Sequence, residues 1–86
     1  MKIFTHRLFK KQYAKLSIRV QEKFKERRDI FLYDEFNPLL NNHPLDGEYQ
    51  GMRSFNITGD YRVIYEKESN DVCIFYAIDT HSNLYQ

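Results

Sequence analysis

The spacing of apolar residues changes once along this 86-residue chain, near Gly51, and that change limits the folds the chain can adopt. Before Gly51, apolar residues such as Val20, Phe24 and Phe31 are spaced as on one face of a helix. After Gly51, apolar residues alternate with a period of two, which is typical of strands. The sequence therefore predicts an α+β fold in which helices precede most of the sheet.

The first half predicts two helices. Thr5 can cap a helix that runs to about Leu16, and Ser17 is a favourable N-cap for the next one. The second helix should end before Asn37 and Pro38, because the residue before a proline disfavours the helical conformation. Since no spacer separates the two helices, we expect them to form a helical hairpin.

The second half predicts three strands, at residues 52–57, 61–67 and 72–78. The turns at residues 58–60 and 68–71 are short enough to require antiparallel pairing. Residues 2–4 are a further strand candidate, and residues 37–51 form a connector rich in Pro, Gly and Asn. We expect one domain over residues 1–86, a helical hairpin packed on one face of a three- or four-stranded antiparallel sheet.

Charge is segregated along the chain, although the net charge is only +1. Residues 1–28 contain ten Lys or Arg and two Asp or Glu, a net of +8, whereas residues 29–86 contain three and ten, a net of −7. This asymmetry indicates either a basic face for a polyanion or an acidic partner, or a solvated helix surface that faces an acidic sheet edge.

Several features predict a cytoplasmic protein. No apolar run approaches the roughly 20 residues of a membrane helix, and the N-terminus becomes charged too early for a signal peptide. The single Cys73 cannot form an internal disulfide, which favours a reducing compartment. Because Cys73 lies in an apolar strand pattern with no adjacent cation, we interpret it as a buried hydrophobic residue rather than a nucleophile.

Two histidines are candidates for acid–base chemistry. His43 precedes Pro44 in the connector, and His81 follows the last predicted strand. Histidine is the side chain best suited to proton transfer near neutral pH. The alternative is that each is an exposed loop residue with a structural hydrogen bond. The spacings of zinc ligands and the glycine loops that bind phosphates or dinucleotides do not occur, so no metal and no cofactor are expected.

Charged and aromatic residues also occur around the strand at residues 61–67. Arg62 offers a planar fork to phosphate, or else forms a surface salt bridge, and Arg53 can line the same face one strand earlier. Asp60 is either a functional carboxylate or an ordinary turn residue. Tyr61 and Tyr85 can stack on unpaired bases or pack in the core.

Three blocks of residues resemble those of a known family. They are His43-Pro44-Leu45-x-Gly47 with Gly51-x-Arg53, then Asp60-Tyr61 with Ile64-Tyr65, and then Thr80-His81-Ser82-x-Leu84-Tyr85. Together with the helical hairpin, they resemble the YafQ branch of the RelE/ParE toxin superfamily over most of the chain. The central Tyr-Arg-Val-Ile-Tyr strand is shared by the wider superfamily, including its gyrase-inhibiting ParE members.

The resemblance implies a bacterial type II toxin that cleaves mRNA in the ribosomal A site and is neutralised by a cognate antitoxin. Position by position, His43, Asp60 and His81 match acid–base residues, and Tyr85 takes the place of a C-terminal aromatic residue. Arg62 matches the arginine that RelE-type members use on the central strand. Tyr61 stands where the branch often has Trp.

Two residues depart from the YafQ pattern. Asn56 stands where members tend to have another histidine, and Ala77 stands where they tend to have an arginine on the last strand. Arg62 can supply the missing positive charge from the neighbouring strand. If Arg62 does not supply that charge, the chain would be a catalytically weakened relative.

The expected reaction is attack of an RNA 2′-hydroxyl on the adjacent phosphorus, without a metal. It needs a base, an acid and a cation for the phosphoryl oxygens. We assign the cation to Arg62 with Arg53, and the acid and base to His43 and His81 in either order. Asp60 would act as base or orient a histidine. Tyr61 and Tyr85 would hold bases of the RNA, and Asn56 is a further candidate for substrate binding.

The sequence makes two further predictions for this function. The basic segment at residues 1–28 would contact ribosomal RNA. The candidates His43, Asp60, Arg62, His81 and Tyr85 come from a loop, a turn, a strand and the tail. Only a shared task would gather them, so the nuclease hypothesis predicts that they lie on one concave surface.

Two other functions stay open. A ParE-like gyrase inhibitor, or an antitoxin-binding relative without nuclease activity, would share the fold, but a gyrase inhibitor does not need the paired histidines. A stand-alone regulatory nucleic-acid-binding protein would explain the basic half but not the clustered polar groups.

Overall fold

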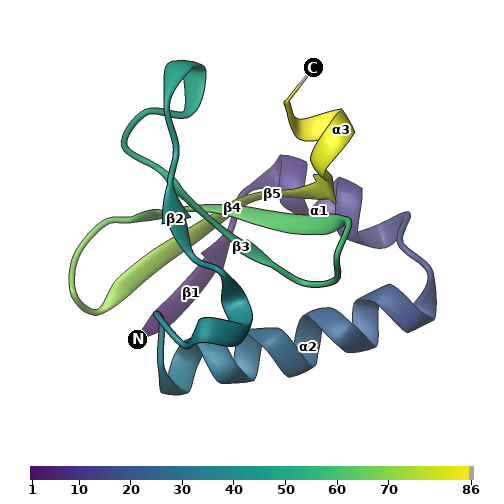
Figure 1. The fold of residues 1–86 in the computed structure, drawn as a ribbon, viewed down its shortest axis with the longest axis horizontal. Helices are drawn as coiled ribbons and strands as arrows, with labels where there is room; N and C mark the ends of the chain where they lie inside the picture. Colours follow the sequence, from purple (N-terminus) through teal and green to yellow (C-terminus); the bar gives the residue numbers. More distant parts are fainter. Residues whose placement is uncertain (86) are drawn as a thin grey trace.

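A sheet with helices on both faces forms the framework of the chain in the computed structural model, which describes residues 1–85 (Figure 1). Within these residues the strand order is β1-β5-β4-β3-β2. The strands are β1 (Lys2–Thr5), β2 (His43–Pro44), β3 (Arg53–Asn56), β4 (Tyr61–Lys67) and β5 (Val72–Thr80). The helices are α1 (Arg7–Ala14), α2 (Ile18–Tyr33) and α3 (His81–Leu84), with short 3-10 helices η1 (Pro38–Leu40) and η2 (Gly47–Tyr49).

The sheet confirms most of the predicted pairing. β3, β4 and β5 pair antiparallel, as the short turns require. Two features differ from the prediction: β1 pairs with β5 in parallel, and β2 adds a fifth strand at the opposite edge. The direction of β1 depends on the path of the helical hairpin, which local sequence does not record. With two residues, β2 is too short to show an alternating pattern.

The helical hairpin is confirmed, but its first helix begins later than predicted. His6 is the N-cap of α1, and its Nδ1 accepts a hydrogen bond from the backbone N–H of Leu8 at 3.0 Å. The predicted cap, Thr5, is instead the last residue of β1, opposite Phe75, so strand pairing overrides its capping preference. Ser17 caps α2 as predicted. Among the described helices, none has the length and apolarity needed to cross a membrane.

The larger core lies between the sheet and the helical hairpin and consists mainly of aromatic rings. Phe9 and Phe31 from the helices are buried against Phe55 and Phe75 from the sheet. The rings of Phe31 and Phe55 stack with centroids 4.8 Å apart. Cys73 is buried in the same cluster, and this burial raises the pKa of its thiol to about 12. The interpretation of Cys73 as a buried hydrophobic residue is therefore confirmed.

A smaller apolar cluster lies on the other face of the sheet. It consists of Leu45, Ile64, Ala77 and Leu84. Leu84 belongs to α3 and Leu45 to the loop after β2, and both segments rise on the same side of the sheet (Figure 1). The central strand β4 is consequently buried on both sides, with Val63 toward the hairpin and Ile64 toward α3.

Candidate active site

The face of the sheet opposite α1 and α2, here called the open face, carries a row of polar side chains. Successive side chains of a strand point to opposite faces, so Phe55 and Val63 face the hairpin while Asn56 and Arg62 point away from it. Asn56 lies opposite Arg62, and Arg62 lies opposite Asp79. These three side chains therefore cross β3, β4 and β5 in one row, at the end of the sheet where α3 begins.

The guanidinium group of Arg62 is held by its strand neighbour. Nη1 of Arg62 donates a hydrogen bond to Oδ1 of Asn56 at 2.8 Å. The ion pairs found within residues 1–85 involve other side chains, so the alternative of a surface salt bridge for Arg62 is not supported. Arg62 is half-buried, has one fixed nitrogen and forms no ion pair with a carboxylate of residues 1–85, so it has donors left for an anionic group.

His43 lies in β2, and the contacts of its ring define which nitrogen is free. Nδ1 of His43 lies 2.9 Å from the backbone oxygen of Asn41. A carbonyl oxygen only accepts hydrogen bonds, so Nδ1 must carry a proton, and Nε2 is left to exchange one. Asn41 has a φ of 47°, in the left-handed region that asparagine tolerates. Directly paired residues of neighbouring strands point to the same face of a sheet. His43 pairs with Ser54, and Ser54 pairs with Ile64, which packs against α3. His43 is therefore on the open face.

His81 is the first residue of α3 and Tyr85 is its C-cap, and both lie beside the turn that carries Asp60. The backbone N–H of His81 donates to the backbone oxygen of Asp60 at 2.9 Å. The rings of His81 and Tyr85 are in contact, with centroids 4.8 Å apart. Thr80 caps the helix through a bond to the N–H of Asn83. Three of the predicted residues, Asp60, His81 and Tyr85, are therefore neighbours at one end of the sheet.

Tyr49, a residue that the sequence did not indicate, holds α3 from the other side. Its hydroxyl donates to the backbone oxygen of Leu84 at 3.2 Å, and its ring meets that of Tyr85 edge-on at 6.1 Å. Burial, followed by the charge of Glu48, raises the pKa of Tyr49, so the hydroxyl remains a donor at neutral pH. In the sequence, Tyr49 stands out only as an aromatic residue between Gly47 and Gly51, and this pattern does not reveal which segment its ring contacts.

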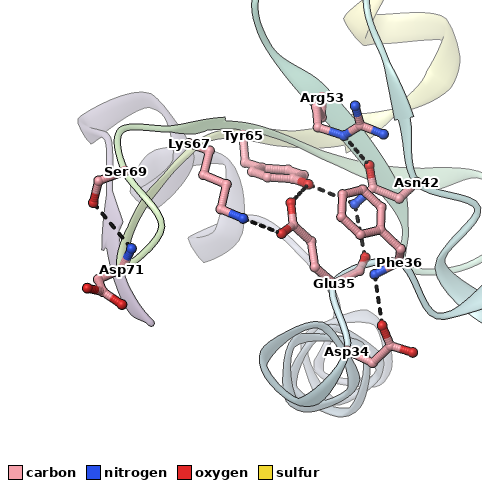
Figure 2. Close-up of polar contacts among 9 residues, drawn as sticks. All are labelled: Asp34, Glu35, Phe36, Asn42, Arg53, Tyr65, Lys67, Ser69 and Asp71. Atoms are coloured by element: carbon pink, nitrogen blue, oxygen red, sulfur yellow. Dashed lines mark hydrogen bonds and ion pairs between the residues drawn. The ribbon is translucent and has the colours of Figure 1, made fainter.

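Arg53 and Tyr61 are on the helix side of the sheet. Arg53 is three residues from Asn56 along β3, so the two side chains point to opposite faces, and the expectation that Arg53 lines the face of Arg62 is wrong. Nε of Arg53 donates to Asn42 at 2.8 Å, and its guanidinium lies 5.1 Å from the ring centre of Phe36 (Figure 2). Tyr61 packs beside the larger core and is half-buried.

A cleft of about 850 Å³ separates α2 from the turn between β3 and β4. Asp60 and Tyr61 line it on the sheet side. Basic side chains of α2 line the opposite wall, namely Arg19, Lys23 and Arg27. Asp60 and Tyr61 therefore lie where the helix side meets the open face, and the cleft brings part of the basic first segment close to the candidate site.

The predicted site residues are thus divided between two regions. His43, Asn56 and Arg62 are on the open face, with Asp60, His81 and Tyr85 at its α3 end, while Arg53 and Tyr61 are on the helix side. A common concave surface for the first group stays a prediction. Among residues 1–85, no group of three or more His, Cys, Asp or Glu is placed to hold a metal ion.

Solved structures of several small bacterial toxins share this architecture. YafQ from E. coli strain BL21(DE3) is similar, with a TM-score of 0.83 at 19% sequence identity over 99% of this chain and 98% of that chain. In the E. coli DinJ–YafQ toxin–antitoxin complex the TM-score is 0.80 at 20% identity, over 99% and 97% of the two chains. The YoeB/ParE toxin from Agrobacterium tumefaciens gives 0.78 at 22% identity, over 94% and 99%. At these identities the likeness concerns the fold.

The sequence itself identifies the family. Residues 1–86 match the profile of the bacterial toxin of type II toxin–antitoxin systems, YafQ. The chain therefore belongs to the YafQ toxin family, as its His-Pro-Leu and Thr-His-Ser blocks indicated. No curated protein sequence matches the chain closely enough to serve as a relative.

Proposed function

We propose that this toxin is a ribosome-dependent, metal-independent endoribonuclease that cleaves mRNA in the ribosomal A site. The observation that supports this most is the fixed guanidinium of Arg62 on the open face, without a carboxylate partner among the described residues. In the proposed reaction, the RNA 2′-oxygen bonds to the adjacent phosphorus and the bond to the 5′-oxygen breaks. The products are a 2′,3′-cyclic phosphate and a 5′-hydroxyl, and Arg62 stabilises the negative charge on the phosphoryl oxygens.

Two proton transfers accompany this reaction. One histidine removes the proton of the 2′-hydroxyl, and the other donates a proton to the departing 5′-oxygen. His43 would act through Nε2, since its Nδ1 is bonded to a carbonyl oxygen. His81 would act from α3, with Asp60 beside it as an orienting group or as an alternative base. Tyr85, next to the His81 ring, offers a surface on which a base can stack.

Asn56 fits a supporting role in this site. Its amide oxygen holds Arg62, so it acts on the phosphate through the arginine, in addition to any contact with RNA. Ala77 is buried in the same apolar cluster as Leu84 and carries no charge. Arg62 is thus the residue that would replace an arginine missing at position 77.

The partners we propose are a cognate antitoxin, the ribosome and mRNA. The crystal structure of the E. coli DinJ–YafQ toxin–antitoxin complex supports the antitoxin as a partner, because its toxin shares this fold. The segment with net charge +8 lies largely on α1 and α2 and suits both ribosomal RNA and an acidic antitoxin segment. Contacts with RNA phosphates should weaken strongly as salt is raised.

Replacement of His81 by alanine provides the main test. Because His81 is exposed, the His81→Ala chain should fold normally, yet mRNA cleavage should fall by about 10²- to 10⁴-fold. The 5′ ends of mRNA would be mapped after induction, and the 3′ ends tested for a cyclic phosphate. Purified wild-type protein should still cleave A-site mRNA when EDTA is present. A parallel measurement must show that the ribosomes remain intact under the same conditions.

The same experiment separates the alternatives. If His81→Ala and Arg62→Ala both retain full toxicity, the nuclease proposal fails. A change in DNA supercoiling with intact mRNA would favour a gyrase inhibitor. If the folded chain binds an antitoxin but neither cleaves mRNA nor alters DNA supercoiling, it is an antitoxin-binding relative without nuclease activity.

A further inference from the structure

A network of polar side chains connects Glu35, Tyr65, Lys67, Asn42 and Arg53 (Figure 2). We call it the Glu35 network. Tyr65 donates to Oε2 of Glu35 at 2.6 Å and accepts from Nδ2 of Asn42 at 2.7 Å. Lys67 donates to Oε1 of Glu35 at 2.7 Å, and Nε of Arg53 donates to Oδ1 of Asn42 at 2.8 Å.

The orientation of every group in the network is determined. Arg53 can only donate, so Oδ1 of Asn42 faces Arg53 and Nδ2 faces the other way. That amide nitrogen also donates to the backbone oxygen of Glu35 at 3.1 Å, which ties residue 42 back to residue 35. The Tyr65 hydroxyl uses both its proton and a lone pair, and the side chain is fully buried. Such saturated, partly buried networks hold their members in one geometry.

The charge state of the network is fixed at neutral pH. Burial, and then the hydrogen bond to Glu35, raises the pKa of Tyr65 above its usual range, so the phenol stays protonated. Burial opposes ionisation of Glu35, but hydrogen bonds from Lys67 and Tyr65 outweigh it and lower the pKa of the carboxyl. The donors and acceptors described above therefore persist across the pH range in which histidines titrate.

One member of the network, Asn42, immediately precedes His43 in the chain. Asn42 is the residue just before β2, and its side chain is bound on the helix side by Tyr65 and Arg53. His43, the first residue of β2, is on the open face, so the bonds of Asn42 hold the chain where it enters β2. The backbone oxygen of Asn41, two residues before His43, lies 2.9 Å from Nδ1 of the imidazole ring. β2 pairs with β3 over only two residues, which by itself holds an edge segment weakly.

We propose that the Glu35 network positions His43 for RNA cleavage, with Glu35, Asn42 and Tyr65 as positioning residues. This inference rests on the proposed nuclease function. Tyr65 and Glu35 act through Asn42, which holds the chain where it enters β2. A purely structural network would support stability without any specific effect on the His43 ring.

The test compares two conservative changes of tyrosine to phenylalanine. Tyr65→Phe removes the hydroxyl at the centre of the network and keeps the ring packed against Phe31 and Phe55. Tyr13→Phe is the matched control, since it removes a hydroxyl that bonds a backbone oxygen at 3.5 Å between the two helices, away from β2. Asn42→Ala is a second test variant, because it breaks the network at a half-buried position outside the core.

The first readout is single-turnover cleavage of mRNA on programmed ribosomes. Tyr65→Phe and Asn42→Ala should lower the rate of the chemical step by about 10- to 100-fold, as expected for a displaced catalytic group, with little change in the concentration that gives half-maximal rate. Tyr13→Phe should cleave like the wild type. In a His43→Ala background, Tyr65→Phe should cause no further loss, because its effect passes through His43.

The second readout is the NMR spectrum of the His43 ring nitrogens, which reports the Nδ1–H tautomer without any substrate. The wild type and Tyr13→Phe should show one fixed tautomer, whereas Tyr65→Phe and Asn42→Ala should show averaging. A folded Tyr65→Phe chain with wild-type cleavage, or an equal further loss in the His43→Ala background, would overturn the inference. If the wild type cleaves no mRNA, the proposed function fails, and unchanged ring signals in both variants would then also overturn the positioning role.

Discussion

At the scale of single residues, the hydrogen bond between Asn56 and Arg62 gives the arginine a fixed direction that it would not have alone. A free arginine on a sheet face samples many rotamers, but one bond at 2.8 Å to a strand neighbour fixes the direction of the guanidinium. A fixed cation stabilises developing charge without paying for reorganisation during the reaction. The site therefore depends on the pair rather than on Arg62 alone.

Arg62→Ala should reduce mRNA cleavage by about 10²- to 10³-fold, because it removes the preorganised cation. Arg62→Lys should recover only part of the rate, since lysine has no fork with which to bond both Asn56 and a phosphate. Both variants would be compared in single-turnover cleavage on ribosomes. Equal activity of Arg62→Lys and the wild type would show that charge alone is sufficient.

Glu35 should make stability depend on acid. Burial raises its pKa, but hydrogen bonds from Lys67 and Tyr65 dominate, so the folded pKa lies below the ordinary value of 4.5. A lowered pKa stabilises the fold above pH 4.5, and this contribution is lost as the pH falls through the folded pKa. Glu35→Gln should therefore be less stable than the wild type at pH 7, with a difference that shrinks below pH 4.5 in urea unfolding. A difference that is constant with pH would contradict this.

At the scale of elements, α3 is too short to be stable alone, and its contacts with other elements keep it in place. It has four residues, whereas isolated helices need about 12 to 15. Leu84 is buried against the open face, Asp60 accepts the first backbone N–H, and Tyr49 donates to the last carbonyl. His81 and Tyr85 are therefore positioned by a loop, a turn and a cluster that belong to three other parts of the chain.

Tyr49→Phe should release the end of α3 while preserving the aromatic contact with Tyr85. Amide hydrogens of α3 should exchange faster with deuterium, and cleavage should fall because His81 is less fixed. Tyr33→Phe is the matched control, since Tyr33 is 93% exposed and remote from this contact. Unchanged exchange in α3 would mean that Leu84 and Asp60 are sufficient to hold it.

At the scale of the whole molecule, the two faces of the sheet have different tasks. One face is covered by the helical hairpin, which supplies the larger core and most of the positive charge. The other is covered only in part, by α3 and the loop after β2, and leaves the polar row accessible. This division allows one surface of a small chain to bind partners while another carries the candidate chemistry.

Expression of the wild-type chain alone should arrest bacterial growth, and co-expression of its cognate antitoxin should relieve the arrest. The expectation follows from membership of the YafQ toxin family and from the basic surface of the hairpin, which suits an acidic segment. Colony counts after induction provide the measurement, with His81→Ala as the non-toxic control. Normal growth despite strong expression of folded wild-type protein would contradict a toxin.

The sequence by itself determined the α+β class, the helical hairpin and the three antiparallel strands. These follow from hydrophobic period, capping residues and short turns, which act over a few neighbouring positions. The candidate residues His43, Asp60, Arg62, His81 and Tyr85 were also found in this way, because polar side chains at strand ends stand out locally. The family blocks supplied their proposed roles.

Only the tertiary structure decided which face each side chain occupies and what holds it there. Arg53 and Arg62 look alike in sequence, yet strand register places them on opposite faces. Tyr49, Asn42 and Glu35 gave little local signal, because their importance comes from contacts with residues 23 to 35 positions away. The parallel pairing of β1 and the two-residue β2 arise in the same way, from packing between distant segments, which no local pattern encodes.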